Sequence, residues 1–121
     1  MYTAYVECEV SRTLRILSKK WTFLIILHMY NSPEELRFSD FREVIPGITP
    51  KVLSERLKEL EEEEIVHRHV IEQSTPPKTM YSLTPCGIES VEIIKATKKW
   101  TLHWKEHPPI CPIYQKERCP I

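Results

Sequence analysis

Glycine is nearly absent from this chain of 121 residues, which holds only Gly47 and Gly87. A phosphate-binding Walker loop and a G-x-G-x-x-G fingerprint each need several glycines within a few positions, so neither can occur here. The sequence also lacks a histidine-anchored metal motif, a nucleophile elbow and a carboxylate pair in a forced geometry. We therefore expect neither an enzyme nor a resident cofactor or metal.

Long hydrophobic runs are missing as well. The longest covers residues 23–27, whereas a membrane span needs roughly 18 to 20 apolar residues. The N-terminus has no basic segment followed by an apolar one, so it does not resemble a secretory signal. We expect a cytoplasmic protein that does not associate with membranes. With 41% hydrophobic residues, the chain suits one compact domain rather than two.

The chain also has no excess of positive or negative charge. Lys and Arg together number 17, as do Asp and Glu, so the overall basic excess typical of many nucleic-acid-binding proteins is not present. The charges are nevertheless segregated along the chain: −2 over residues 1–10, +4 over 11–33, −5 over 34–64 and +3 over 65–121. Any affinity for nucleic acid must therefore depend on a few well-placed contacts.

The first half of the chain shows helical periodicity. An amphipathic helix with a basic face is expected over residues 7–18, and an almost wholly apolar helix over residues 21–30 is the candidate for the centre of the core. Residues 36–38 form a short extended piece, after which Ser39 can cap a brief helix. Three apolar side chains of that helix are expected to face inward: Phe41, Val44 and Ile45.

The next helix has a clear start signal. Thr49 supplies a hydroxyl N-cap and Pro50 fits the first helical position, so a helix is expected to run to about Glu63. Its leucines at i, i+4 and i+7 spacing form one core-facing stripe: Leu53, Leu57 and Leu60. At about 100° per residue, the opposite face is polar. It comprises Lys51, Glu55, Lys58 and Glu62, with Ser54 and Arg56 flanking the stripe.

The second half of the chain predicts a hairpin and a long helix. Residues 65–72 alternate in polarity and residues 79–83 return as a second strand, with a proline-stiffened loop between them. A second cap-plus-proline signal, Thr84-Pro85, opens the longest helix, which is expected to reach His107. This helix carries more apolar surface than one small domain needs.

This order of elements is typical of a winged helix-turn-helix. The predicted fold class is mainly α with a small β-hairpin, with an added N-terminal helix and a long C-terminal dimerisation helix; it covers residues 1–107, followed by a Pro- and Cys-containing tail over 108–121. In such a fold the third helix of the unit enters the DNA major groove and the hairpin, or wing, touches the backbone or minor groove. The helix over 49–63 is therefore the predicted recognition helix. The candidate DNA contacts are Thr49, Pro50, Lys51, Ser54, Glu55, Arg56 and Lys58 on this helix, with Arg68 and Lys78 on the wing.

Motifs spread over about residues 8–104 carry a family resemblance. They are Cys8 with Val10, then Leu14, Lys20-Trp21-Thr22, Arg37-Phe38-Ser39, Ile45 through Leu53, Arg56-Leu57, Leu60-Glu61, Tyr81 through Thr84, and Gly87. In order and spacing this set resembles the HxlR family of bacterial and archaeal transcriptional regulators. The resemblance implies a DNA-binding homodimer on a pseudo-palindromic double-stranded operator, with the first and last helices at the dimer interface. The interface candidates are Val10, Leu14, Leu17, Val91, Ile94, Leu102 and Trp104.

Cys8 is the main candidate for a sensing residue. In some members of the family that the chain resembles, an N-terminal cysteine senses oxidants or electrophiles. Here Glu7 and Glu9 disfavour the thiolate that sensing needs, while Arg12 opposes that effect. Cys8 is therefore a candidate either for sensing or for a partly buried structural thiol.

The remaining cysteines and the paired histidines give weaker signals. Cys111 and Cys119 in the tail are candidates for a disulfide or for metal ligands, including a cross-link to the N-terminal cysteine. Cys86, at the second position of the last helix, is expected to pack into the core. His67 and His69 share one strand face, but two donors do not close a zinc site, so no metal site is predicted.

Two other functions stay open from the sequence. A winged helix can serve as a protein-interaction module without binding DNA, in which case the recognition helix and wing of the dimer would show no continuous positive surface. Alternatively, the DNA-binding regulator can also respond to redox state or metal through its cysteines, in which case their thiols would react on mild oxidation.

Overall fold

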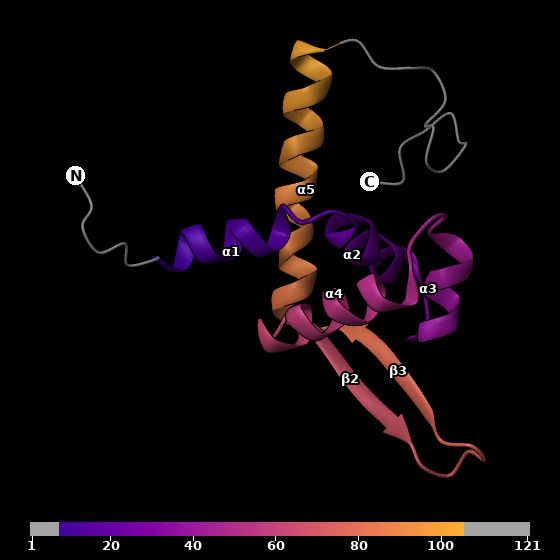
Figure 1. Cartoon of the computed structure of the whole chain (residues 1–121). Coiled ribbons are helices and arrows are strands. Elements are labelled where there is room, and N and C mark those ends of the chain that lie inside the picture. The colour runs from indigo at the N-terminus through magenta and orange to yellow at the C-terminus, as the bar shows by residue number, and fades with distance from the viewer. Residues whose placement is uncertain (1–7, 106–121) are drawn as a thin grey trace.

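The computed structural model describes residues 8–105, and the order of helices and strands expected from the sequence is confirmed within that range (Figure 1). The elements are α1 (Glu9–Leu17), α2 (Thr22–Asn31), β1 (Leu36–Arg37), α3 (Phe38–Val44), α4 (Pro50–Glu62), β2 (Val66–Ile71), β3 (Lys78–Leu83) and α5 (Pro85–Trp104). Residues 1–7, the expected end of the last helix at His107 and the tail over 108–121 lie outside the described residues.

The hairpin belongs to a small antiparallel sheet of three strands in the order β1-β3-β2. Val66 pairs with Leu83 in the hairpin, and Leu36 pairs with Tyr81 on the other side of β3. The sequence predicted the hairpin and the extended piece before α3, but not that this piece joins the hairpin as a third strand. The sheet therefore ties the wing to the first half of the chain.

The core lies between α2, α4, α5 and the inner face of the sheet. Ile25 and Ile26 of α2 are fully buried, which confirms the apolar helix as the centre of the core. The predicted stripe of α4 is also confirmed, because Leu53, Leu57 and Leu60 are all at most 2% exposed. This packing leaves the opposite side of α4 facing solvent.

The brief helix α3 differs from the expectation in two details. It begins at Phe38, where Arg37 is the N-cap and its backbone N–H donates to the Asp40 carboxylate at 2.8 Å, so Ser39 is not the cap. Phe41 and Ile45 are buried as predicted, but Val44 is 47% exposed. The helix starts earlier because the Asp40 carboxylate accepts from the Arg37 N–H, which places the cap two residues before Ser39.

The start of α5 is fixed against the start of β2. Thr84 caps the helix by accepting a hydrogen bond from the Gly87 N–H at 3.0 Å, and its hydroxyl donates to the Glu64 carbonyl at 2.5 Å. A Cβ at Gly87 would lie 2.1 Å from the Ile65 carbonyl oxygen, so only glycine allows the helix to approach this closely. In the part of the chain that the structure describes, no helix is both long and apolar enough to cross a bilayer.

Candidate nucleic-acid interface

The N-terminus of α4 is built as the sequence predicts. The Thr49 hydroxyl accepts a hydrogen bond from the Val52 N–H at 3.2 Å, and Pro50 occupies the first helical turn. Gly47 adopts a φ of 87°, a left-handed conformation that suits glycine and allows the sharp turn between α3 and α4. Thr49, Pro50 and Lys51 are all exposed, so this helix end is open to a phosphate.

The outward face of α4 is polar and accessible. Five of its residues are exposed: Lys51, Ser54, Glu55, Lys58 and Glu62. Among residues 8–105, neither Lys51 nor Lys58 forms an ion pair. The two ammonium groups are therefore available to an anionic partner.

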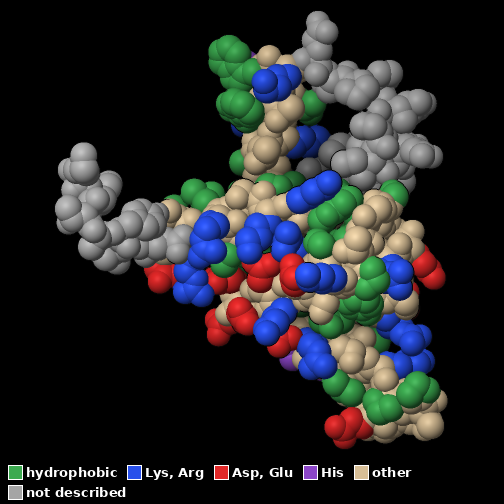
Figure 2. Space-filling model, viewed as in Figure 1, with side chains coloured by type: hydrophobic (Ala, Val, Ile, Leu, Met, Phe, Trp, Pro, Cys, Tyr) green, Lys and Arg blue, Asp and Glu red, His purple; other side chains and the backbone are tan. Residues whose placement is uncertain are grey.

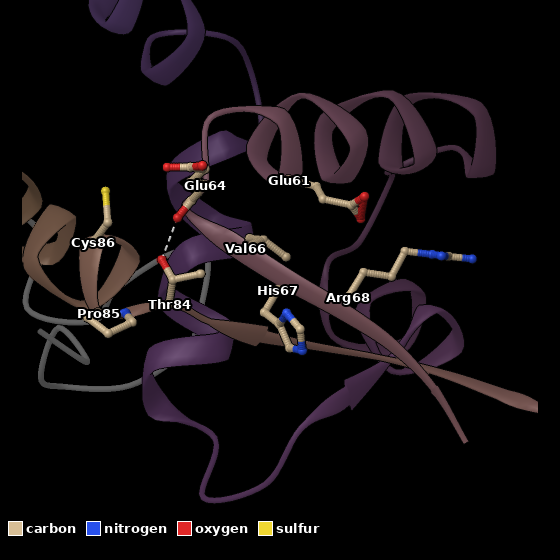
Figure 3. Close-up of a pocket in the computed structure, with 8 residues that line it drawn as sticks. All are labelled: Glu61, Glu64, Val66, His67, Arg68, Thr84, Pro85 and Cys86. Carbon is tan, nitrogen blue, oxygen red and sulfur yellow. Dashed lines mark hydrogen bonds between the residues drawn. The ribbon is translucent and has the colours of Figure 1, made fainter. Parts of the chain in front are cut away.

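The wing extends away from the helical body next to α4 (Figure 1). Lys78 is exposed at the first position of β3, directly after the loop that contains Pro76 and Pro77. Arg68 is also exposed, and Figure 3 shows it extending from β2 beside α4. Neither cation has an ion-pair partner within the described range. The wing thus places two more free cations close to the outward face of α4.

A shallow cavity of about 520 Å³ separates the base of the wing from the last turn of α4 (Figure 3). Its lining comprises Glu61, Glu64, Val66, His67, Arg68, Thr84, Pro85 and Cys86. Cys86 is exposed, so the expectation that it packs into the core is wrong. The reason is the close approach at Gly87, which packs against Ile65 and Leu83 and so turns the preceding residue of α5 outward.

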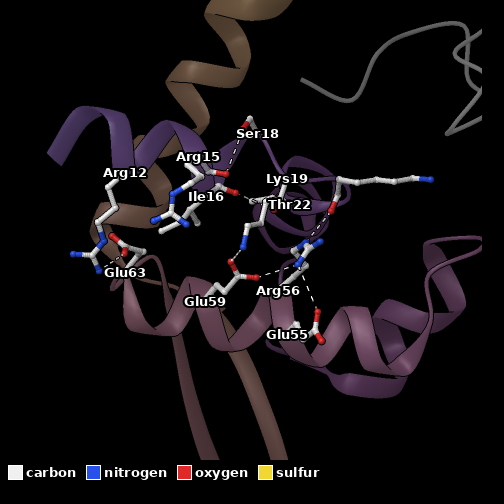
Figure 4. A network of polar contacts seen from close by, with 11 residues as sticks. Arg12, Arg15, Ile16, Ser18, Lys19, Thr22, Glu55, Arg56, Glu59 and Glu63 are labelled. Carbon is white, nitrogen blue, oxygen red and sulfur yellow. Dashed lines mark hydrogen bonds and ion pairs between the residues drawn. The ribbon is translucent and has the colours of Figure 1, made fainter. Parts of the chain in front are cut away.

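Arg56 does not join the outward face of α4. Its side chain is only 16% exposed, its Nε donates to the Lys20 carbonyl at 3.0 Å and its guanidinium pairs with Glu59 at 3.0 Å. These contacts turn the side chain toward the junction of α1 and α2 (Figure 4). The structure therefore directs Arg56 away from the outward face of α4, although its guanidinium still lies 4.0 Å from the Glu55 carboxylate.

Basic residues of α1 and of the turn that follows it also face α4. Arg12 pairs with Glu63 at 2.7 Å, and Lys19 pairs with Glu59 (Figure 4). Figure 2 shows basic side chains over α1 bordering acidic side chains along α4. The sequence did not predict this set of contacts, although the positive charge of residues 11–33 and the negative charge of residues 34–64 were the available signal.

Much of the exposed apolar surface of the described residues lies on α1 and α5. Val10 and Leu14 are 68% and 56% exposed, and Leu102 and Trp104 are 44% and 70% exposed. Trp100 extends this surface on α5.

Three other interface candidates are corrected: Leu17, Val91 and Ile94 are at most 5% exposed in the single chain. They are part of its own core and have no surface left for a partner, because α2 packs against both α1 and α5.

Cys8 is exposed at the N-cap of α1, where its sulfur accepts a hydrogen bond from the Ser11 N–H at 3.3 Å. The alternative of a partly buried thiol is therefore wrong for the single chain. Cys111 and Cys119 lie outside the described residues.

The rings of His67 and His69 stack with their centroids 5.8 Å apart, and His69 Nδ1 lies 2.8 Å from the Glu35 carboxylate. Within residues 8–105 no three histidine, cysteine or acidic side chains are grouped so as to hold a metal ion.

Within residues 8–105, His28 on α2 and Lys95 on α5 have shifted pKa values. Burial lowers the pKa of His28 on α2 below its usual value. A hydrogen bond from Lys95 to the Tyr30 hydroxyl, together with the charge of Glu92, raises the pKa of Lys95. These groups lie on the side of the molecule where α5 packs on α2, away from the outward face of α4.

A three-helix unit with a capped third helix, an exposed polar helix face and a protruding wing defines the class of winged helix-turn-helix DNA-binding proteins. Residues 16–109 match the model of the HxlR-like helix-turn-helix family. The chain belongs to this family. It is a DNA-binding transcriptional regulator and not an enzyme.

Named relatives come from Bacillus subtilis (strain 168). The HTH-type transcriptional regulator YodB is 41% identical over 92 residues, which are 76% of this chain and 80% of YodB. The uncharacterized HTH-type transcriptional regulator YybR is 40% identical over 93 residues, which are 77% of this chain and 72% of YybR.

Solved structures agree with the fold. The reduced form of YodB from B. subtilis superposes with a TM-score of 0.72 and 35% identity, covering 84% of this chain and 97% of that chain. The redox regulator HypR in its oxidized form gives a TM-score of 0.69 and 36% identity, covering 83% of this chain and all of HypR.

Proposed function

We propose that α4 is the recognition helix and enters the major groove of an operator, while the wing lies along the neighbouring backbone. The observation that carries the proposal is the outward face of α4, which is exposed along its length and holds two cations without ion-pair partners among the described residues. A protein that binds the chromosome in this way acts in the cytoplasm.

The side chains have distinct roles in this arrangement. Lys51 and Lys58 bind phosphates from α4, and Arg68 and Lys78 do so from the wing. The start of α4, where the helix dipole is positive and the Lys51 side chain is exposed, favours a further phosphate. Ser54 and Glu55 lie between the two lysines and reach base edges, where a carboxylate accepts a hydrogen bond from a cytosine amino group.

A homodimer places two such helices on one operator. The exposed apolar residues of α1 and α5 give the surface for this contact, because contiguous apolar patches on a single chain mark sites of association. The remaining interface residues are Val10, Leu14, Leu102 and Trp104. With twofold symmetry, the operator is close to palindromic and its half-sites lie roughly 34 to 36 Å apart.

The experiment that tests this function is selection of bound duplexes from a random DNA library by the full chain. We expect one recurrent, near-palindromic sequence, and we expect its affinity measured by gel shift to exceed that of a random duplex at least about a thousandfold. Recovery of unrelated sequences with equal, weak affinity would favour a protein-interaction module instead.

A second candidate function is control of DNA binding by a thiol at Cys8. The supporting observation is the exposed sulfur at the N-cap of α1, a helix that carries part of the proposed dimer surface. Solved structures similar to this chain include a redox regulator in its oxidized form and diamide-treated YodB. Oxidation of Cys8, alone or with Cys111 or Cys119, would thus act directly at the dimer contact.

We expect mild diamide treatment to lower the affinity of the wild-type protein for the selected duplex about tenfold or more, because a disulfide at the end of α1 changes how the two chains meet. The Cys8→Ser variant should bind with unchanged affinity before and after treatment. Cys86→Ser is the matched control, since its thiol is also exposed but lies at the base of the wing, and it should respond as the wild type does. An equal response of Cys8→Ser and wild type to diamide would rule out Cys8.

A further inference from the structure

The acidic and basic segments of the sequence meet along one face of α4. Arg12 pairs with Glu63 at 2.7 Å, and Glu59 accepts from both Lys19 and Arg56. Arg56 also donates to the Lys20 carbonyl at 3.0 Å, just before α2 begins. We call these contacts the α1–α4 ladder (Figure 4).

We propose that the α1–α4 ladder is a positioning device: it fixes the angle of the recognition helix relative to α1, and thereby relative to the dimer partner. The inference rests on the proposed role of α4 in reading DNA. It assigns Arg12, Lys19 and Arg56 to the alignment of α4 rather than to contact with phosphates.

Three faces of α4 have three different functions. The leucine stripe faces the core, and the lysines with Ser54 and Glu55 face outward. The third face is formed by Arg56, Glu59 and Glu63, at i, i+3 and i+7 spacing, so these side chains follow one line along the helix. Arg12 lies on α1 and Lys19 lies two residues after the end of this helix, and each of them pairs with one of the two glutamates. The basic residues therefore meet this face of α4 at two points along it.

The rest of α1 is weakly attached to the body of the chain. The helix has only nine residues, and its buried residues, Ile16 and Leu17, lie at its C-terminal end. A helix of this length is marginal in water without tertiary contacts. In the N-terminal half, Val10 and Leu14 are exposed in the single chain, and the ion pair of Arg12 with Glu63 ties this half to α4. This ion pair therefore contributes to the direction of α1.

The ladder is partly shielded from water. The side chains of Arg56, Glu63 and Glu59 are only 16%, 17% and 22% exposed. Isolated surface ion pairs contribute little to stability. Charge-assisted hydrogen bonds that share a carboxylate have restricted geometry, so they can fix the orientation of one helix relative to another. Direction matters here because base contacts tolerate small displacements poorly, whereas non-specific attraction to phosphates does not depend on register.

The consequence is a link between dimer geometry and DNA recognition. Val10 and Leu14 of α1 contact the partner in the proposed dimer, and the ladder joins the same helix to α4. A change in how α1 meets the partner is transmitted to the spacing of the two recognition helices. Loss of the ladder should therefore lower affinity for the operator more than affinity for random DNA.

A charge swap tests the ladder. The probes are the duplex selected with the wild-type protein and a random duplex of equal length, each titrated at several salt concentrations. Arg12→Glu and Glu63→Arg each place like charges together and should lower affinity for the selected duplex about tenfold, which corresponds to typical coupling between contacting charges. The double variant Arg12→Glu/Glu63→Arg recreates the pair with the original net charge and should return to within about threefold of the wild type.

Three controls separate positioning from other roles. Lys99→Glu makes the same change in charge as Arg12→Glu at an exposed site on α5, and it should keep the preference for the selected duplex. The milder Arg12→Gln removes the pair without repulsion, so it replaces Arg12→Glu if that variant unfolds; it should lower affinity about threefold. Lys51→Glu reports on the proposed function itself.

The outcomes are distinct. If the double variant stays as weak as Arg12→Glu, with a salt slope reduced by about 1 per protomer, Arg12 binds a phosphate and the inference is wrong. The inference also fails if the single variants bind both duplexes as the wild type does while Lys51→Glu loses affinity; the role of α4 then stands. If Lys51→Glu has no effect either, the proposed function fails, and the ladder proposal fails with it.

Discussion

The Lys51→Glu variant should bind the selected duplex about a hundredfold more weakly than the wild type. Lys51 lies in the first turn of α4, is exposed and has no ion-pair partner among residues 8–105. The substitution removes one phosphate contact in each half-site and places a carboxylate against the DNA backbone, so each protomer contributes about 1 kcal/mol or more to the loss.

The salt dependence gives the same variant a second readout. Because each lost phosphate contact releases about one counterion fewer, the slope of log K against log salt should become shallower by about 2 for the dimer. Affinity for a random duplex should also fall, since phosphate contacts do not depend on sequence. Lys99→Glu, with the same change in charge on α5, is the matched control. If both variants bind alike, α4 does not approach the DNA.

Substitution of the exposed tryptophan at the end of α5 should have the largest effect of all on operator binding. Trp104 is 70% exposed in the single chain, and Trp100, one helical turn earlier on the same face of α5, is 58% exposed. We expect Trp104→Lys to give a monomer, because a charged side chain at the contact loses the burial of a large ring, about 2 to 3 kcal/mol in each chain. A monomer reaches only one half-site.

Operator affinity should then fall more than a hundredfold, since two linked half-sites gain that much or more from binding as one unit. Sedimentation of the protein without DNA measures the first effect, and gel shift measures the second. Val44→Lys is the control, because Val44 is a 47% exposed apolar residue on α3, away from α1 and α5; this variant should remain dimeric. A dimeric Trp104→Lys protein with full affinity would show that α5 does not form the contact.

Local sequence signals predicted most of the fold. Two Thr-Pro pairs located the starts of α4 and α5, and both threonines cap their helices as expected. The leucine spacing in α4 predicted its buried stripe, and the same geometry therefore predicted its exposed face. These signals succeed because a cap or a helical stripe depends on residues within one or two turns.

The parts that the sequence did not predict depend on contacts between distant elements. Arg56 flanks the core stripe of α4, but its direction is decided by the Lys20 carbonyl, 36 residues away in the sequence. Val91 and Ile94 are apolar like Trp104, and only the packing of α2 on α5 separates core from surface. Periodicity marks apolar residues without showing whether a partner chain or the chain's own core covers them.

A net charge of zero is compatible with DNA binding because some of the charges pair with one another inside the molecule while others face solvent. Glu59 and Glu63 pair with basic residues of α1 and of the turn that follows it, and these contacts neutralise their charge inside the molecule. Four cations that form no ion pair within the described residues lie on the outward face of α4 and on the wing: Lys51, Lys58, Arg68 and Lys78. Composition alone could not reveal this division.

A salt titration of the wild-type protein on its selected duplex tests the central claim most directly. Four phosphate-binding cations in each of two protomers predict a slope of log K against log salt of about −7, together with at least a thousandfold preference over random DNA. A slope shallower than about −2, with equal affinity for both duplexes, would contradict the assignment of α4 and the wing as the DNA-binding surface.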